Sequence, residues 1–432
     1  VVELVHHRVA TDERAAAKIA FNAGVDMEMV SNTYLDHMES LLESGEVNHE
    51  RLDDAVRRIL TVKFRLGLFE QPYVDPQEAS RVQFSDENRA LARKAAGQAM
   101  VLLQNKDAIL PLPKDLPSLA VIGPLASERM ALLGSWTLDG LPDETQTLVE
   151  AVRAACPQTQ VFDVSGSLTD EMLMAAADAT AIILAVGESN QRNGEHNNVA
   201  SLDLPAGQEA LVEHVAGLGK PVILVVFAGR PVNLWRLQRF ADAILYAWHP
   251  GTMGAAAAAD VIFGDANPSG RLPVSFPRSE GHIPAHYNHK STGRSLRYVD
   301  SLATPLYPFG YGISYTRFSY SNLSVTPSEI GPAETVTVSV TLTNSGERPG
   351  DEVVQCYIQD VVASLTRPVR ELKGFQRVSL GPGESAEVQF KLGPRQLSFV
   401  GRNNRREVEP GLFLVWVGGD SQAELETRFW VK

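Results

Sequence analysis

Carboxyl groups that could transfer a proton stand in one long polar loop. This loop, Glu188–Ser201, has the sequence ESNQRNGEHNNVAS and follows an apolar run with the length of a buried strand. Glu188 lies at the end of that run and Glu195 lies in the middle of the loop. A glutamate serves as a general acid near neutral pH only when burial or a neighbouring carboxylate raises its pKa. The alternative is that Glu195 is a solvated loop carboxylate, because Glu is mostly exposed in proteins.

Other patterns associated with chemistry are weak. His282, His286 and His289 are spaced like zinc ligands on a helix, but Pro284 makes a helix implausible there and no fourth ligand is evident. Gly123 follows an apolar run but lacks the further glycines of a nucleotide-binding turn. No phosphate loop, CxxC or GxSxG motif occurs in the sequence. We therefore expect neither a metal nor an organic cofactor.

Length and charge argue against several classes of protein. At 432 residues the chain is too long for one ordinary core, so we expect two or three domains. A net charge of −13 without a Lys/Arg run disfavours nucleic acid and anionic membranes as partners. No apolar stretch approaches the roughly 20 residues of a membrane-spanning helix. Cys156 and Cys356 fall in different predicted domains, so we expect no disulfide between them. The oligomeric state is left open.

Residues 1–70 are predicted to be mainly helical. Apolar residues at helical spacing indicate helices within Val1–Ala23, Leu35–Leu42 and Leu52–Phe69, and the apolar run Val25–Val30 is predicted to be one strand among them. One strand cannot close a core by itself, but it suits the last β/α turns of a larger barrel. A linker and a helix are predicted over residues 71–97.

Residues 98–277 are predicted to form an α/β sandwich, because apolar runs alternate with helical patterns. This alternation implies mainly parallel strands and a sheet covered on both faces. In such sheets ligands bind beyond the carboxyl ends of the strands, which is where the loop with the two glutamates lies. The expected strands are Leu119–Gly123, Gln160–Val164, Ala181–Gly187, Val222–Ala228 and Ala243–Trp248, and the expected helices are Leu148–Ala155, Asp170–Ala177, Gln208–Leu218 and Gly254–Phe263.

From residue 320 to residue 432 the apolar pattern changes to period two. The runs TVTVSVTLTN, EVVQCYIQDV, EVQFKL and LFLVWVG are separated by turn signals that contain Asn, Gly and Pro. This pattern predicts an all-β sandwich of the fibronectin type III-like kind.

The segment Gly270–Tyr315 is too rich in Pro, Gly and aromatic residues for a regular element. Its aromatic residues indicate an ordered connector, which we place at 278–319, since disordered linkers are poor in them. The paired segments LPVSFP and YPFGYGISY resemble the connector of multidomain glycoside hydrolase family 3 enzymes, the β-glucosidase and β-xylosidase type. Essentially the whole chain is similar to the C-terminal two-thirds or so of such a three-domain enzyme. The implied architecture is a remnant of a (β/α)8 barrel, an α/β sandwich and a β-sandwich.

The resemblance also implies a reaction. It is the retaining double displacement at a terminal β-D-glucosyl residue of a β-glucoside or oligosaccharide. Matching VGE…E…LxLP to the family pattern assigns the acid/base role to Glu195 and leaves Glu188 as a structural or pocket-lining group. Trp136, in LLGSWTLDG, resembles a tryptophan that forms an apolar wall of the sugar pocket, with a core tryptophan as the alternative. Gly140 stands where some plant relatives carry a second tryptophan, which argues against a strong preference for longer glucans.

The retaining mechanism needs a second carboxylate, the nucleophile, and we expect it outside this chain. The family's nucleophile is an Asp in a Ser-Asp-Trp/His motif, and the helix after that motif resembles VVELVHHRVA. We therefore expect the nucleophile shortly before Val1 and predict that the isolated chain is inactive. Asp26, in AGVDMEM, is the internal substitute, but the family does not use this position as nucleophile. We expect Asp26 to line the pocket or to be a packed carboxylate at a strand end.

A protein from a different class, a non-catalytic carbohydrate-binding or scaffold protein, would also lack most of the barrel. Such a protein would begin with Met or a processed signal and with a complete element, whereas VVELVHHRVA begins inside an amphipathic pattern. This favours a fragment of a hydrolase. Glucose or xylose could be the sugar, and the resemblance favours a periplasmic or secreted parent.

Overall fold

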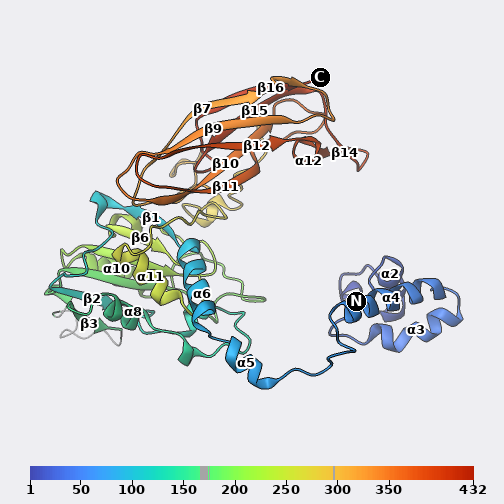
Figure 1. Cartoon of the computed structure of the whole chain (residues 1–432), viewed down its shortest axis with the longest axis horizontal. Helices are drawn as coiled ribbons and strands as arrows, with labels where there is room; N and C mark the ends of the chain where they lie inside the picture. The colour runs from blue at the N-terminus through green and yellow to red at the C-terminus, as the bar shows by residue number, and fades with distance from the viewer. Residues whose placement is uncertain (166–173, 175, 295–296) are drawn as a thin grey trace. The chain divides into compact units, whose positions relative to one another are not determined.

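The computed structural model of the chain describes residues 1–165, 174, 176–294 and 297–432 (Figure 1). The chain divides into two compact units, Val1–Ser85 and Asp86–Lys432. Each unit has its own core and is described by itself.

The first unit is helical. Its helices are α1 (Glu3–His6), α2 (Glu13–Asn22), α3 (Thr33–Glu43), α4 (His49–Arg65) and α5 (Pro76–Val82). The helices α2, α3 and α4 are amphipathic, and their apolar faces meet in a small core. This core contains Ala17, Phe21, Leu41, Val47 and Ala55.

The predicted strand in the first unit is wrong. None of the described residues of this unit forms a strand, and Val25–Val30 is an irregular segment after α2. Met29 and Val30 are 80% and 99% exposed. A strand needs a neighbouring strand to satisfy its backbone hydrogen bonds, and the helices around this segment offer no such partner.

The second unit contains a six-stranded sheet with helices on both faces. The strands are β1 (Val101–Asn105), β2 (Ser118–Ile122), β3 (Gln160–Val164), β4 (Ala181–Gly187), β5 (Val222–Phe227) and β6 (Ala243–Tyr246). They lie in the order β1-β6-β5-β4-β2-β3, and all neighbouring pairs are parallel except β1 with β6. Every residue of β2, β4, β5 and β6 is buried, as expected for strands covered on both faces. The predicted α/β sandwich is therefore confirmed.

Two apolar clusters lie on opposite faces of this sheet. One face is covered by α6 (Asp86–Ala99), α8 (Leu148–Ala155) and α11 (Gly254–Phe263), and α6 and α11 lie beside each other there (Figure 1). The other face is covered by α10 (Gln208–Ala216). The short helix α7 (Met130–Leu133) follows β2. Most of the predicted helix Asp170–Ala177 falls outside the described residues.

The C-terminal part of the second unit is the predicted β-sandwich. One sheet has the order β11-β10-β15-β16-β8 and the other has the order β12-β9-β7. Residues of β9 alternate strictly between buried and half-buried, which is the period-two pattern of a strand with one face on the core. The strands are β7 (Phe318–Thr326), β8 (Glu329–Ile330), β9 (Val336–Asn344), β10 (Gly350–Asp360), β11 (Glu371–Leu380), β12 (Ser385–Leu392), β15 (Gly411–Gly418) and β16 (Glu426–Val431), with α12 (Pro394–Leu397) and the small hairpin β13 (Phe399–Val400) and β14 (Arg406–Glu407).

The connector between the sheet and the sandwich is ordered. Phe276 and Tyr307 pair as an isolated bridge, and their rings also meet edge to face. Tyr287 stacks on Phe309, with centroids 4.2 Å apart. The Arg271 guanidinium pairs with Glu352 of β10 at 2.6 Å, and both side chains are more than nine-tenths buried. Aromatic packing and this ion pair hold the connector in place, as its composition predicted. No helix among the described residues is long and apolar enough to cross a membrane.

Candidate active site at the carboxyl ends of the parallel strands

The loop that carries the two glutamates leaves the sheet at the carboxyl end of β4. Gly187, the last residue of β4, has φ +135°, and a Cβ at this position would lie 1.8 Å from the carbonyl oxygen of Phe227 on β5. Only glycine tolerates this approach, so the chain can turn away directly at the strand end. Segments that follow β5 and β6 border the same edge. This is where an α/β sheet binds its ligands.

Glu195 lies at the tip of a tight turn. The amide of Asn197 donates to the carbonyl of Gly194 at 3.2 Å, which closes a four-residue turn with Glu195 in its second position. Gly194 and His196 have positive φ values of +101° and +66°. The Glu195 side chain is 68% exposed, and its Oε1 lies 4.0 Å from Nε2 of His196. The turn therefore presents the carboxyl group to whatever occupies the space beyond this edge.

Trp136 lies next to this turn. Ser135 Oγ is 2.6 Å from the carbonyl oxygen of Asn190 and 3.0 Å from Oδ1 of Asn193, and it also contacts the carbonyl of Asn193. A Cβ at Gly194 would lie 2.8 Å from Ser135 Cβ and 3.8 Å from Nε1 of Trp136. The structure thus brings Trp136 to the residue that precedes Glu195. Trp136 is 68% exposed, so it is not a core residue.

Glu188 has a different environment. Its side chain is 2% exposed and is paired with Arg230 at 3.1 Å and with Arg192 at 3.6 Å. A buried carboxylate that is held between two guanidinium groups is a structural element. The interpretation of Glu188 as a structural group therefore fits this geometry.

His249 is a half-buried polar residue that the sequence analysis did not single out. It follows β6, and its Nδ1 lies 2.5 Å from the carbonyl oxygen of Ala131, which fixes Nδ1 as the protonated nitrogen. Partial burial lowers the pKa of His249 and so disfavours the charged ring. A Cβ at Gly229 would lie 3.0 Å from His249 Nε2 and 2.8 Å from Oδ1 of Asn193. In the sequence, the one sign of a functional role for His249 is its position directly after the predicted strand Ala243–Trp248.

The far end of the loop is tied to the connector. Oε1 of Glu280 accepts hydrogen bonds from Ser201 Oγ at 2.9 Å and from the amide of Leu202 at 2.7 Å. These bonds, with the amide of Leu202 first, lower the pKa of Glu280. His282, in the same connector, accepts from Ser279 through Nδ1 and donates to the carbonyl of Leu302 through Nε2. Both ring nitrogens of this potential zinc ligand are therefore engaged in hydrogen bonds.

Asp26 belongs to the first unit. Its Oδ1 lies 2.7 Å from a guanidinium nitrogen of Arg51, and its Oδ2 lies 3.8 Å from Arg58. The side chain is 24% exposed. Its surroundings are those of an ion-paired carboxylate near the start of the irregular segment Val25–Val30.

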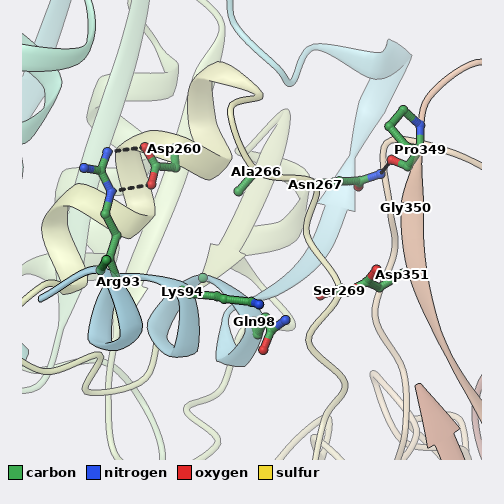
Figure 2. A pocket seen from close by; sticks show the side chains of 12 residues that line it. Arg93, Lys94, Gln98, Asp260, Ala266, Asn267, Ser269, Pro349, Gly350 and Asp351 are labelled. Carbon is green, nitrogen blue, oxygen red and sulfur yellow. Dashed lines mark hydrogen bonds and ion pairs between the residues drawn. The ribbon is translucent and has the colours of Figure 1, made fainter. Parts of the chain in front are cut away.

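A cavity of about 470 Å³ lies elsewhere in the second unit, between α6, the chain after α11 and the turn before β10. Arg93 reaches from α6 to Asp260 of α11, with Nε 2.6 Å from Oδ2 (Figure 2). Lys94, Asn267 and Asp351 also line the cavity. None of the side chains proposed from the sequence lines it.

Models of protein families match three parts of the chain. Residues 2–62 match the glycosyl hydrolase family 3 N-terminal domain, residues 100–315 match the glycosyl hydrolase family 3 C-terminal domain, and residues 352–421 match a fibronectin type III-like domain. The second match alone covers half of the chain and contains the sheet, the loop with Glu195 and the connector.

Curated relatives and solved structures agree with these matches. The periplasmic β-glucosidase of Salmonella typhimurium is 37% identical over 98% of this chain, and a β-xylosidase of Formosa agariphila is 35% identical over 97%. The crystal structure of a β-glucosidase from Listeria innocua in complex with glucose has a TM-score of 0.91 at 36% identity over 100% of this chain. A mutant of that enzyme in complex with laminaribiose has a TM-score of 0.92 at the same identity and coverage. The chain spans 61% of the length of both curated relatives and of the Listeria innocua enzyme in the glucose complex, and 62% of the length of its mutant.

Proposed function

Because the chain belongs to glycosyl hydrolase family 3, we propose that it is part of a retaining β-glucosidase that removes terminal, non-reducing β-D-glucosyl residues. The relatives and structural neighbours named above are β-glucosidases and a β-xylosidase, and two of the neighbours hold glucose and laminaribiose. We propose that glucose, rather than xylose, is the sugar bound at the site. An aryl β-xyloside tested beside an aryl β-glucoside checks this choice.

We assign the acid/base role to Glu195. The observation that supports this most is its place at the tip of a turn that is tied down on both sides, beside the exposed ring of Trp136. A glycosidase acid must reach the leaving-group oxygen, and a carboxyl group at such a tip can do so. Trp136 supplies a flat apolar surface on which a sugar ring can stack. Its apolar C–H faces then contact the indole while its hydroxyl groups remain free for hydrogen bonds.

The nucleophile is proposed to lie outside these residues. The Ser-Asp-Trp/His motif that carries it in the family does not occur in the sequence. Asp26 is proposed to line the sugar pocket of the whole enzyme, and its pairing with Arg51 argues against a role as nucleophile, because a guanidinium contact ties up the attacking oxygen. A retaining mechanism needs both carboxyl groups. The isolated chain is therefore expected to be inactive.

Two measurements test this proposal. The purified chain should not hydrolyse a chromogenic aryl β-glucoside above the buffer rate. A fusion enzyme, in which this chain replaces the matching 61% of the Listeria innocua β-glucosidase, should hydrolyse it. Turnover by the isolated chain would show that an internal carboxylate attacks, and Asp26→Asn would then be the first variant to make.

The role of Glu195 is tested in the fusion enzyme. Glu195→Ala should slow glucosides with poor leaving groups far more than activated aryl glucosides, because only the former need a proton from the acid. Azide should restore turnover of the activated substrates, since a small anion can replace the water that the missing base would activate. Glu213→Ala, an exposed carboxylate on α10, is the matched control and should change neither rate. Equal losses on both substrates without azide rescue would remove Glu195 from the role.

A further inference from the structure

One arginine spans the turn that carries Glu195. Arg230 lies just after the carboxyl end of β5, and its Nε pairs with Glu188 at 3.1 Å. Its Nη2 donates to the carbonyl of Asn197 at 3.0 Å and also to the carbonyl of Arg192. These two carbonyls lie on either side of Glu195 in the chain. A single guanidinium therefore joins the strand end to the backbone before the turn, at Arg192, and to the last residue of the turn, Asn197.

The chemistry of this contact suits arginine alone. A guanidinium is planar, remains charged and directs several N–H groups along fixed directions, so Nε can meet Glu188 while Nη2 meets the two carbonyls. A lysine ammonium is a point charge that could pair with Glu188 but could not hold both carbonyls in the same geometry. Glu188 is 2% exposed and the Arg230 side chain is 20% exposed, so water competes little for the ion pair between them, whereas the bond to the carbonyl of Asn197 lies at the surface.

Ser135 holds the same turn from another segment, through Asn190 and Asn193. The residues that flank Glu195 are thus fixed from two directions, while the Glu195 side chain itself is 68% exposed. This arrangement fixes the backbone beneath the carboxyl group and leaves the carboxyl group available to a ligand.

We propose that Arg230 is a positioning residue for the acid/base loop: it sets the place of Glu195 relative to the strand ends. The inference rests on the proposed role of Glu195. Proton transfer requires the acid within hydrogen-bonding distance of the leaving-group oxygen, and a misplacement of about 1 Å can cost about 100-fold in rate. Arg230 acts through the backbone of Arg192 and Asn197 and does not itself touch the reacting atoms.

The first test uses the 432-residue chain and hydrogen–deuterium exchange. Arg230→Lys keeps the charge opposite Glu188, so the fold should survive. The amides of residues 190–199 should then exchange at least about tenfold faster, while α11 should keep its rate. Arg278→Lys is the matched control, because Arg278 likewise bridges two backbone carbonyls, those of Thr304 and Pro305. Unchanged exchange in the loop of Arg230→Lys would overturn the proposal.

A second variant covers the case in which Arg230→Lys does not fold. In the double variant Glu188→Gln with Arg230→Met, no buried carboxylate is left without its arginine, and Arg192, which loses its ion pair with Glu188, has a side chain that is 40% exposed. The turn still loses both hydrogen bonds from Arg230. The double variant should show the same faster exchange in residues 190–199. A folded double variant with wild-type exchange there would equally overturn the proposal.

The fusion enzyme supplies a readout that a purely structural role would not move. Arg230→Lys should lower kcat about 100-fold for a glucoside with a poor leaving group, much less for an activated aryl glucoside, and leave KM nearly unchanged. Guanidinium ion should partly restore turnover to Arg230→Ala, because it can occupy the vacated site. A uniform loss on both substrates without rescue would refute Arg230 as a positioning residue. Failure of Glu195→Ala to show leaving-group dependence would instead refute the proposed function.

Discussion

Replacing Asp360 by asparagine should raise the stability of the β-sandwich at neutral pH and change it little at pH 4. Asp360 ends β10, and its side chain is 4% exposed. Burial raises its pKa to about 6; Arg367 opposes this rise, while the carboxylates of Glu409 and Glu371 add to it. The ionised carboxylate is therefore disfavoured in the folded state.

The pH dependence follows from the two pKa values of this group, the ordinary 3.8 and about 6 in the folded chain. Well below pH 3.8 Asp360 is protonated in both the folded and the unfolded chain, so it does not lower the stability of the folded state. As the pH rises from 3.8 to 6 the unfolded chain ionises first, so the folded state loses stability. Above pH 6 the cost is constant at about 3 kcal/mol, from about two pKa units at ~1.4 kcal/mol each. At pH 4 the same linkage leaves only ~0.5 kcal/mol.

The assay is hydrogen–deuterium exchange of the β10 segment across a urea series, which reports the unfolding of the sandwich separately from that of the first unit. Asp360→Asn should shift the midpoint upward at pH 7.5 and barely at pH 4. Glu387→Gln removes an exposed carboxylate from β12 of the same domain and should shift neither midpoint. An equal shift of the Asp360→Asn midpoint at both pH values, or a larger shift at pH 4, would refute the reasoning.

Two further substitutions have defined outcomes. Gly194→Ala places a methyl group 2.8 Å from Ser135 Cβ at a φ of +101°, so the loop should lose ~1–3 kcal/mol of local stability and exchange faster, whereas Gly97→Ala, with open space around its Cβ, should not. Unchanged loop exchange in Gly194→Ala would contradict the turn geometry. Arg271→Met should cost about 3–5 kcal/mol in urea unfolding because it leaves the buried Glu352 carboxylate without its partner. The double variant with Glu352→Gln should recover most of that loss, and no recovery would show that the pair is not the cause.

The elements of the second unit were predictable because their patterns are local. Buried parallel strands have continuous apolar runs in the sequence, and β4, which is buried throughout, has the predicted bounds. The alternation of apolar and polar residues in the sandwich strands was equally easy to recognise in the sequence, since one face of each strand packs on the core. The prediction of a strand at Val25–Val30 was wrong because a strand needs a neighbouring strand, and the pattern of a single segment does not show whether one is present.

Residue types and order in the chain determined the family, the α/β and β-sandwich architecture, and the loop in which a proton-transferring glutamate could stand. Only the tertiary structure decided which residues surround that glutamate. Trp136 and Gly194, the residue before Glu195, are far apart in the sequence, and they lie close together because Ser135 contacts Asn193. Arg230 belongs to no sequence motif. Its role depends on which carbonyl groups lie within reach of its guanidinium, and the fold decides this. Contacts of this kind arise from the folding of distant segments onto one sheet edge, and no local pattern encodes them.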